Sequence, residues 1–234
     1  MKACEYEFEA PQQPPSRLRI LLERPPGSST ATWTLLENHR CPHCPLPTEA
    51  GACCPAAADI EPIVETLGNV ASIATLKVTV TTTQRVYQQT VTGSEAARAA
   101  LGLVMATSAC PILDDMHILA RFHLPFATQD ESTFRLVSAY LMRHFFTQQG
   151  TPDLESLIAK MEDLKKLNIA FANRLRAACS KDAIPNAIVQ LFTLSLAVAG
   201  DAEDGFGNLK EFFRTAETPA PTEKGGPARD DLNH

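Results

Sequence analysis

Four of the seven cysteines are followed directly by proline: Cys41, Cys44, Cys54 and Cys110. Chance placement of the 17 prolines among 234 residues would give about 0.5 such pairs. Three of the four crowd into the segment CPHCPLPTEAGACCP, and the fourth stands far along the chain. Four thiols in similar local settings are the number that a tetrahedral zinc ion or an iron–sulfur cluster requires. The sequence therefore predicts a metal or cluster site at these residues, which we call the four Cys-Pro cysteines.

The spacing of these cysteines bears on which group they would hold. Two residues separate Cys41 from Cys44, so both thiols can point at one metal centre. A structural zinc site more often uses two such close pairs, whereas this chain offers one pair and two single cysteines, Cys54 and Cys110. A dispersed ligand set fits an iron–sulfur cluster better. The pattern thus favours a 4Fe-4S cluster, with zinc as the alternative.

Other residues near the motif leave alternatives open. Cys53 adjoins Cys54 and could be the ligand in its place, and His39 or His43 could replace one thiol. Packed free thiols or a redox disulfide would also explain cysteines in proline-rich loops. Cys4 and Cys179 lack a following proline and are expected to be ordinary thiols.

A second segment, RFHLPFA, follows soon after Cys110. Its Arg121 could hold an anionic group with two parallel hydrogen bonds, and its His123 could act as an acid, a base or a ligand. If these residues lined a pocket beside the thiols, the chain would be a thiol-based enzyme or redox sensor. The alternative is that both are structural residues, with Arg121 paired to a carboxylate. No familiar catalytic or nucleotide-binding motif is present, so no substrate or reaction follows from the sequence.

The periodicity changes from strand to helix along the chain. Alternating residues predict strands in EYEFEA, SRLRILLER and TATWTLLE, and TLKVTVTTTQRVYQQTV predicts a hairpin that turns near Thr82–Gln84. A short helix is expected near Ile60–Leu67. From Ser94, taken as an N-cap, a helix should run to the Cys110-Pro111 junction, with Asp182 capping a later one. Further helices are expected at about 112–120, 131–148, 153–179, 183–199 and 207–215.

These elements predict an α+β fold, in which a small antiparallel sheet in the N-terminal third packs with a C-terminal helical bundle and a cysteine-rich loop joins them. We expect a β-rich part at 1–93, a helical bundle at 94–217 and a disordered tail at 218–234. The net charge of −6 argues against nucleic acid and anionic membranes as partners. Without a signal peptide or an apolar span, the expected location is the cytoplasm, where thiols stay reduced.

The helix from Leu154 carries an apolar stripe with Asn168 at a position that would set register in a coiled coil. Additional apolar positions widen the stripe, as in a helix packed within its own bundle. We nevertheless expect a homo-oligomer, because symmetric dimers are the commonest assembly. The sequence does not identify a redox partner or a small-molecule ligand.

Five ordered strings, NHRCPHCPL, ACCPAA, GLVMATSACPIL, ARFHLPFA and KDAIPNA, resemble an uncharacterised bacterial protein family with the motifs CPxCPL, CPVA, MAxSGCP and RFHLPFA. The resemblance covers about Trp33 to Ala187 and implies no known activity. It aligns Cys54, rather than Cys53, with the third cysteine of the family, and includes the RFHLPFA motif. Ala109 replaces a glycine of the pattern and Ala56 a valine.

Overall fold

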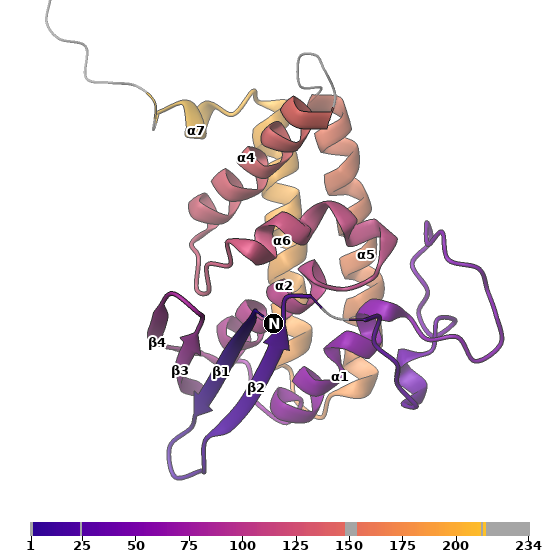
Figure 1. Ribbon diagram of the computed structural model, residues 1–234, viewed down its shortest axis with the longest axis vertical. Helices are drawn as coiled ribbons and strands as arrows, with labels where there is room; N and C mark the ends of the chain where they lie inside the picture. The colour runs from indigo at the N-terminus through magenta and orange to yellow at the C-terminus, as the bar shows by residue number, and fades with distance from the viewer. Residues whose placement is uncertain (1, 24, 148–153, 212, 214–234) are drawn as a thin grey trace, which may run out of the picture.

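The computed structural model describes residues 2–23, 25–147, 154–211 and 213. It has the predicted α+β fold, with a four-stranded antiparallel sheet followed by a helical bundle (Figure 1). The expected tail at 218–234 and the end of the last expected helix lie outside the described residues. The strands, in the spatial order β2-β1-β3-β4, are β1 (Ala3–Glu9), β2 (Ser16–Leu21), β3 (Thr75–Thr81) and β4 (Val86–Thr92).

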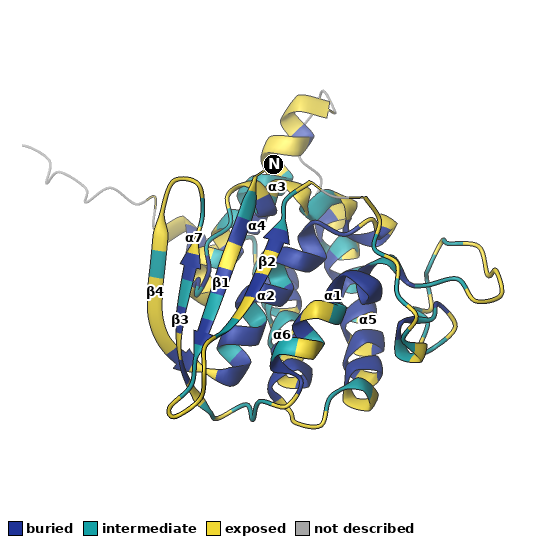
Figure 2. Ribbon diagram, turned by 60° about the horizontal axis from the view of Figure 1, so that its bottom comes forward, coloured by how far each residue is buried: buried dark blue, intermediate teal, exposed yellow. Residues whose placement is uncertain are grey.

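Alternation of apolar and polar residues gives the sheet one buried and one exposed face (Figure 2). Tyr6 of β1 lies opposite Leu18 of β2 and Val80 of β3, and all three side chains are buried. The opposite face carries cross-strand ion pairs such as Glu7–Arg17, whose charged atoms are 2.7 Å apart. The hairpin turn predicted near Thr82–Gln84 is confirmed by the antiparallel pairing of β3 with β4.

The helices form the rest of the core. One hydrophobic cluster joins the buried sheet face to α1, α2, α5 and α6, with α6 packed along α5 and against α2. The predicted division at residue 93 falls where β4 runs directly into α2. The helical elements are η1 (Thr32–Thr34), α1 (Pro55–Leu67), α2 (Gly93–Ala106), η2 (Pro111–Met116), α3 (His117–Arg121), α4 (Gln129–Thr147), α5 (Leu154–Ala178), α6 (Ala183–Glu203) and α7 (Gly207–Glu211), of which η1 and η2 are 3₁₀ helices.

The strand predicted around Trp33 and Leu35 is wrong. The segment forms the 3₁₀ turn η1, in which the Thr34 hydroxyl donates to the carbonyl of Ala31 at 2.7 Å. Leu35 makes only an isolated antiparallel bridge with Cys53. The carbonyls of Trp33 and Leu35 accept from the Arg174 side chain of α5, so this segment packs against the bundle and does not extend the sheet at the edge strand β2.

Two predicted ends of α2 also need correction. Thr92, not Ser94, is the N-cap: its hydroxyl accepts from the Glu95 amide, and the Glu95 carboxylate accepts from the Thr92 amide. The helix ends at Ala106 rather than at the Cys110-Pro111 junction. The Thr107 hydroxyl donates back to the carbonyls of Leu103 and Val104, which closes the last turn.

Asp182 occupies the N-cap position of α6 but its side chain does not cap that helix. Its carboxylate instead accepts hydrogen bonds from the amide and the hydroxyl of Ser72, at 2.8 and 2.9 Å. These bonds lower the pKa of Asp182 and tie the start of α6 to the segment before β3.

The apolar stripe of α5 packs inside the molecule. Leu157, Met161, Leu164 and Phe171 are buried, and Asn168 is only 5% exposed. Among the described helices, α6 is the one that is long and apolar enough by itself to cross a membrane. The bent pair of α2 with residues 111–121 meets the same criterion only when its two parts are counted as one span. Core helices of globular proteins share these properties, and α6 packs against four other helices of this chain.

Candidate cysteine site

Two of the Cys-Pro cysteines stand at helix starts. Cys54 is the N-cap of α1 and Cys110 is the N-cap of η2, and each has an extended backbone conformation, with ψ of 119° and 120°. The following proline causes this, because it excludes the preceding residue from the helical region and itself suits the first helical position. The Cys-Pro dipeptide is thus a local device that places a thiol beside the unpaired amides of a helix start.

The amides at these helix starts act on the sulfurs. Those of Ala57 and Ala56 lower the pKa of Cys54, and those of Ile112 and Leu113 lower that of Cys110, although neither thiol makes a full capping hydrogen bond. Burial is the larger effect and raises the pKa of both thiols overall. The amides would stabilise a negative charge that the buried surroundings alone disfavour.

The loop that carries Cys41 and Cys44 is tied by its own backbone and by Arg40. The Cys44 amide donates to the Cys41 carbonyl at 3.1 Å, forming a tight turn between the two thiols. The Arg40 guanidinium donates to the carbonyls of Cys44 and Leu46 at 3.1 and 2.5 Å. In both ribbon views this loop projects beside α1 and α5, on the opposite side of the molecule from β3 and β4 (Figures 1 and 2).

The fold brings the four Cys-Pro cysteines into one electrostatic neighbourhood. Burial, together with the charges of Cys54, Cys110 and Cys44, raises the pKa of Cys41 to about 12. Cys44 also raises the pKa of Cys54, and both Cys54 and Cys44 raise that of Cys110. Every pair among the four therefore interacts. As the side chains stand, no three His, Cys, Asp or Glu residues in the described part of the chain are grouped to hold one metal ion.

A buried cation, Arg174 of α5, lies beside three of these thiols. Its side chain is 2% exposed, and the charges of Cys54, Cys41 and Cys44 raise its pKa against the lowering effect of burial. One terminal nitrogen donates to the carbonyls of Trp33 and Leu35, both at 2.7 Å, whereas Nε is buried without a hydrogen-bond partner among the described residues. Arg174 thus anchors the segment before the cysteine loop and directs a positive charge toward the thiols.

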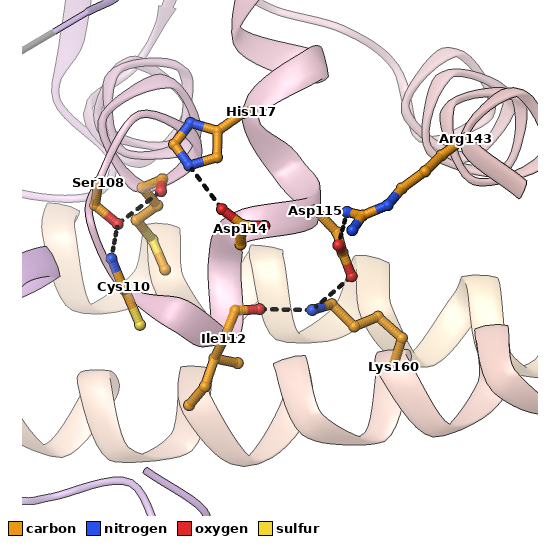
Figure 3. Close-up of polar contacts among 9 residues, drawn as sticks. Ser108, Cys110, Ile112, Asp114, Asp115, His117, Arg143 and Lys160 are labelled. Atoms are coloured by element: carbon orange, nitrogen blue, oxygen red, sulfur yellow. Dashed lines mark hydrogen bonds and ion pairs between the residues drawn. The ribbon is translucent and has the colours of Figure 1, made fainter. Parts of the chain in front are cut away.

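Lys160 supplies a second cation from α5, on the Cys110 side. Its ammonium group donates to the Ile112 carbonyl at 2.7 Å and pairs with Asp115 at 3.0 Å (Figure 3). Arg143 of α4 forms an ion pair with the same carboxylate. Burial lowers the pKa of Lys160, and Cys110 is among the negative groups that raise it. The η2 segment is therefore fastened to α5 directly after the Cys110-Pro111 junction.

The remaining cysteines and the loop histidines occupy different surroundings. The Cys53 thiol donates to the Ser29 carbonyl at 3.1 Å, whereas the charge of Cys54 acts on the pKa of Cys41 and Cys110. Cys54 faces these two thiols, because successive residues of an extended segment point to opposite sides. His39 is exposed. Both ring nitrogens of His43 are buried and have no hydrogen-bond partner among the described residues, and Asp163 lies 4.0 Å from Nε2.

Arg121 and His123 lie apart from the Cys-Pro cysteines. His123 is enclosed beside the sheet, where its Nε2 is 2.5 Å from the Tyr6 hydroxyl, and burial and Arg135 lower its pKa to about 3. Arg121 is exposed and pairs with Glu23 at 3.5 Å. Both residues line a cleft that also contains Cys4, and none of the Cys-Pro cysteines lines that cleft. Cys179 is separate again, and burial raises its pKa to about 11.

Sequence reasoning missed Arg174 and Lys160. Arg174 lies two helical turns after Leu167 and one turn after Phe171, so it falls on the apolar face of α5. A charged residue on a buried stripe is the signal that could have identified it, because such a charge needs a partner.

No curated protein and no solved structure matches this chain. A family described as a domain of unknown function, DUF6901, matches residues 14–214, which include all four Cys-Pro cysteines, Arg174 and Lys160. The match agrees with the resemblance to an uncharacterised family, while the individual motifs remain a prediction. The chain therefore belongs to the DUF6901 family.

Proposed function

We propose that the chain is an iron–sulfur protein in which Cys41, Cys44, Cys54 and Cys110 hold one 4Fe-4S cluster. The observation that supports this most directly is the mutual interaction of all four thiols, which come from three separate segments. The alternative within the same proposal is a structural zinc ion on the same residues. A cluster is the better fit, because the ligands form one close pair and two single cysteines, whereas structural zinc sites more often use two close pairs.

The surrounding charges support a negatively charged group. Four thiolates outweigh the positive charge of an iron–sulfur core, so the buried cluster needs compensation. Arg174 provides a buried cation without a carboxylate partner among the described residues, and the amides at the starts of α1 and η2 provide N–H donors. Amides and cations near cluster sulfurs are among the features that adjust reduction potential. When bound, the cluster would supply one-electron transfer.

A thiol-based catalytic or sensor function has less support. Reactive cysteines have a pKa below the ordinary value, which makes the thiolate available at neutral pH. Burial instead raises the pKa of Cys41, Cys54 and Cys110. Such thiols are poor nucleophiles in the metal-free protein and become thiolates when a metal replaces their protons.

A cysteine variant series tests the proposed ligands. The full chain and the single Cys→Ala variants at 41, 44, 54 and 110 would be purified without oxygen from cells supplied with iron. We expect each variant to lose most of the broad absorbance near roughly 400 nm that a 4Fe-4S cluster gives. Cys179→Ala is the matched control, because this thiol is also partly buried but lies outside the group.

The outcomes separate the alternatives. Loss of absorbance in the four variants but not in Cys179→Ala supports the cluster. One zinc ion per chain that disappears in the same variants would replace the cluster with the structural zinc site. Equal metal content in all five variants would contradict both ligand assignments.

A further inference from the structure

A cleft of about 620 Å³ opens at one end of the sheet, away from the Cys-Pro cysteines. The start of β1, the end of β2 and the β3–β4 turn meet there, since the strands are antiparallel. The chain after α3, at residues 122–124, closes the other side. Sites for small molecules commonly have volumes of about 300–1,000 Å³, so this cleft is large enough for one.

The charge of the cleft contrasts with that of the whole protein. Lys2, Arg85, Arg121 and Arg135 line it, and no Asp or Glu among the described residues does. The whole chain has a net charge of −6, so this gathering of cations is not a reflection of composition. Glu23 offers Arg121 a contact at 3.5 Å, but both side chains are exposed and such pairs are weak. Four positive groups with little compensation would attract anions.

Arg135 is held in position at the inner wall of the cleft. One of its terminal nitrogens donates to the carbonyls of Leu119 and Phe122, at 3.1 and 2.7 Å. Burial lowers the pKa of Arg135, while the charge of Glu131 raises it, and the structure gives Arg135 no ion pair among the described residues. A guanidinium whose orientation is fixed and whose charge is partly desolvated is suited to bind phosphate or carboxylate.

His123 completes this wall with a neutral ring, which the buried Tyr6 hydroxyl contacts from the core side. The Tyr6 hydroxyl bridges the Ala99 carbonyl, at 3.1 Å, and the His123 ring, at 2.5 Å. Tyr6 is fully buried and belongs to the core face of β1, so the imidazole has a fixed orientation. The polar wall therefore combines a fixed cation with a fixed neutral imidazole, beside the hydroxyls of the β3–β4 turn.

We propose that this cleft is a binding site for a small organic anion bearing phosphate or carboxylate groups. Arg135 is the main contact at the inner wall, and Arg85, Lys2 and Arg121 surround the opening. The site is separate from the proposed cluster and does not depend on it, because no Cys-Pro cysteine lines the cleft.

Isothermal titration of the full chain with pyrophosphate and with citrate tests this site and distinguishes phosphate from carboxylate recognition. We expect at least one of the two to bind with a dissociation constant below about 1 mM, and Arg135→Gln to weaken that binding by about tenfold or more. Arg17→Gln removes the same charge from the exposed sheet face, where Arg17 pairs with Glu7, and should change the affinity less than about twofold.

Preference for pyrophosphate would identify phosphate as the recognised group, and preference for citrate would identify carboxylate. Absence of binding by both probes would overturn the proposal, as would equal weakening by Arg135→Gln and Arg17→Gln. Circular dichroism of Arg135→Gln, together with a second variant at the exposed rim, Arg85→Gln, separates loss of the site from loss of the fold. If both folded variants bind as the unmodified chain does, the cleft is not the site.

Discussion

Arg174 is the residue that most closely connects the fold to the proposed cluster. It fixes η1 through two carbonyl oxygens and places a positive charge beside three thiols. Arg174→Met should destabilise the metal-free protein by about 3 kcal/mol, because both carbonyls lose a charged donor. Arg176→Met on the exposed side of the same helix is the control, and urea unfolding monitored by circular dichroism measures both.

Comparison of Arg174→Met with Arg174→Lys tests the electrostatic role of Arg174. In the cluster-loaded protein, loss of a buried positive charge disfavours the more negative reduced state. Arg174→Met should therefore have a lower reduction potential than the unmodified protein, whereas Arg174→Lys should recover much of the difference. An unchanged potential in Arg174→Met, measured by anaerobic redox titration, would show that Arg174 has only the anchoring role.

His123 makes a separate, pH-dependent contribution to stability. Its pKa is about 3 in the folded protein and near 6.5 when unfolded, so the unfolded chain binds a proton first as the pH falls. This contribution is present above pH 6.5 and is lost on acidification toward pH 3. At pH 5 this group has lowered the free energy of unfolding by about 2 kcal/mol relative to neutral pH.

Comparison of variants isolates this contribution from that of the carboxylates. The unfolding free energy of His123→Gln should fall less between pH 7 and pH 5 than that of the unmodified protein. His117→Gln, at an exposed position paired with Asp114, should retain the full decrease. Equal pH dependence in all three proteins would contradict the lowered pKa of His123.

The cysteines could be predicted from the sequence because Cys-Pro is a local motif with a local effect. Proline fixes the backbone of the preceding residue, and this alone places Cys54 and Cys110 at helix starts. Arg174 and Lys160 could not be assigned to the site in this way. Both come from α5, and only the packing of that helix against η1 and η2 brings them to the thiols.

At the scale of elements, the junction of β4 with α2 depends on one capping box. Thr92 ends the strand and begins the helix through reciprocal hydrogen bonds with Glu95. Thr92→Ala should therefore destabilise the protein by about 1 kcal/mol. Thr90→Ala, at an exposed position of the same strand, controls for the lower strand propensity of alanine. Thermal unfolding at neutral pH compares the two, and an equal effect would indicate that the cap contributes nothing.

Elements with a clear hydrophobic period could be predicted, and those defined by tertiary contacts could not. Alternation located β1 and β2, because each of these strands buries one face. The β-branched residues of TLKVTVTTTQRVYQQTV located the β3–β4 hairpin. The same alternation around Trp33 failed. There the backbone carbonyls of Trp33 and Leu35 accept from a guanidinium of α5 rather than from another strand. The ends of α2 differ from the predicted ones for a similar reason, because side-chain hydrogen bonds at Thr92 and Thr107 determine where this helix begins and ends.

In the whole molecule, exposed apolar side chains on α4 give the expected homo-oligomer a candidate contact surface. The stripe of α5 is used inside the bundle, whereas Met142, Phe145 and Phe146 of α4 are 54%, 73% and 72% exposed. We propose that this apolar surface supports self-association. Light scattering during size exclusion should give about twice the 25.4 kDa chain mass, and Phe145→Glu should return it to one chain. Ile73→Glu, at another exposed apolar position, should not. A single-chain mass for the unmodified protein would contradict self-association.

The proposed cluster depends on the whole molecule, because three separate segments must meet to form its site. It is tested most directly by iron and acid-labile sulfide analysis of the full chain, purified anaerobically from cells supplied with iron. The account predicts about four iron and four sulfide per chain. Protein that contains neither iron nor sulfide under these conditions would contradict it.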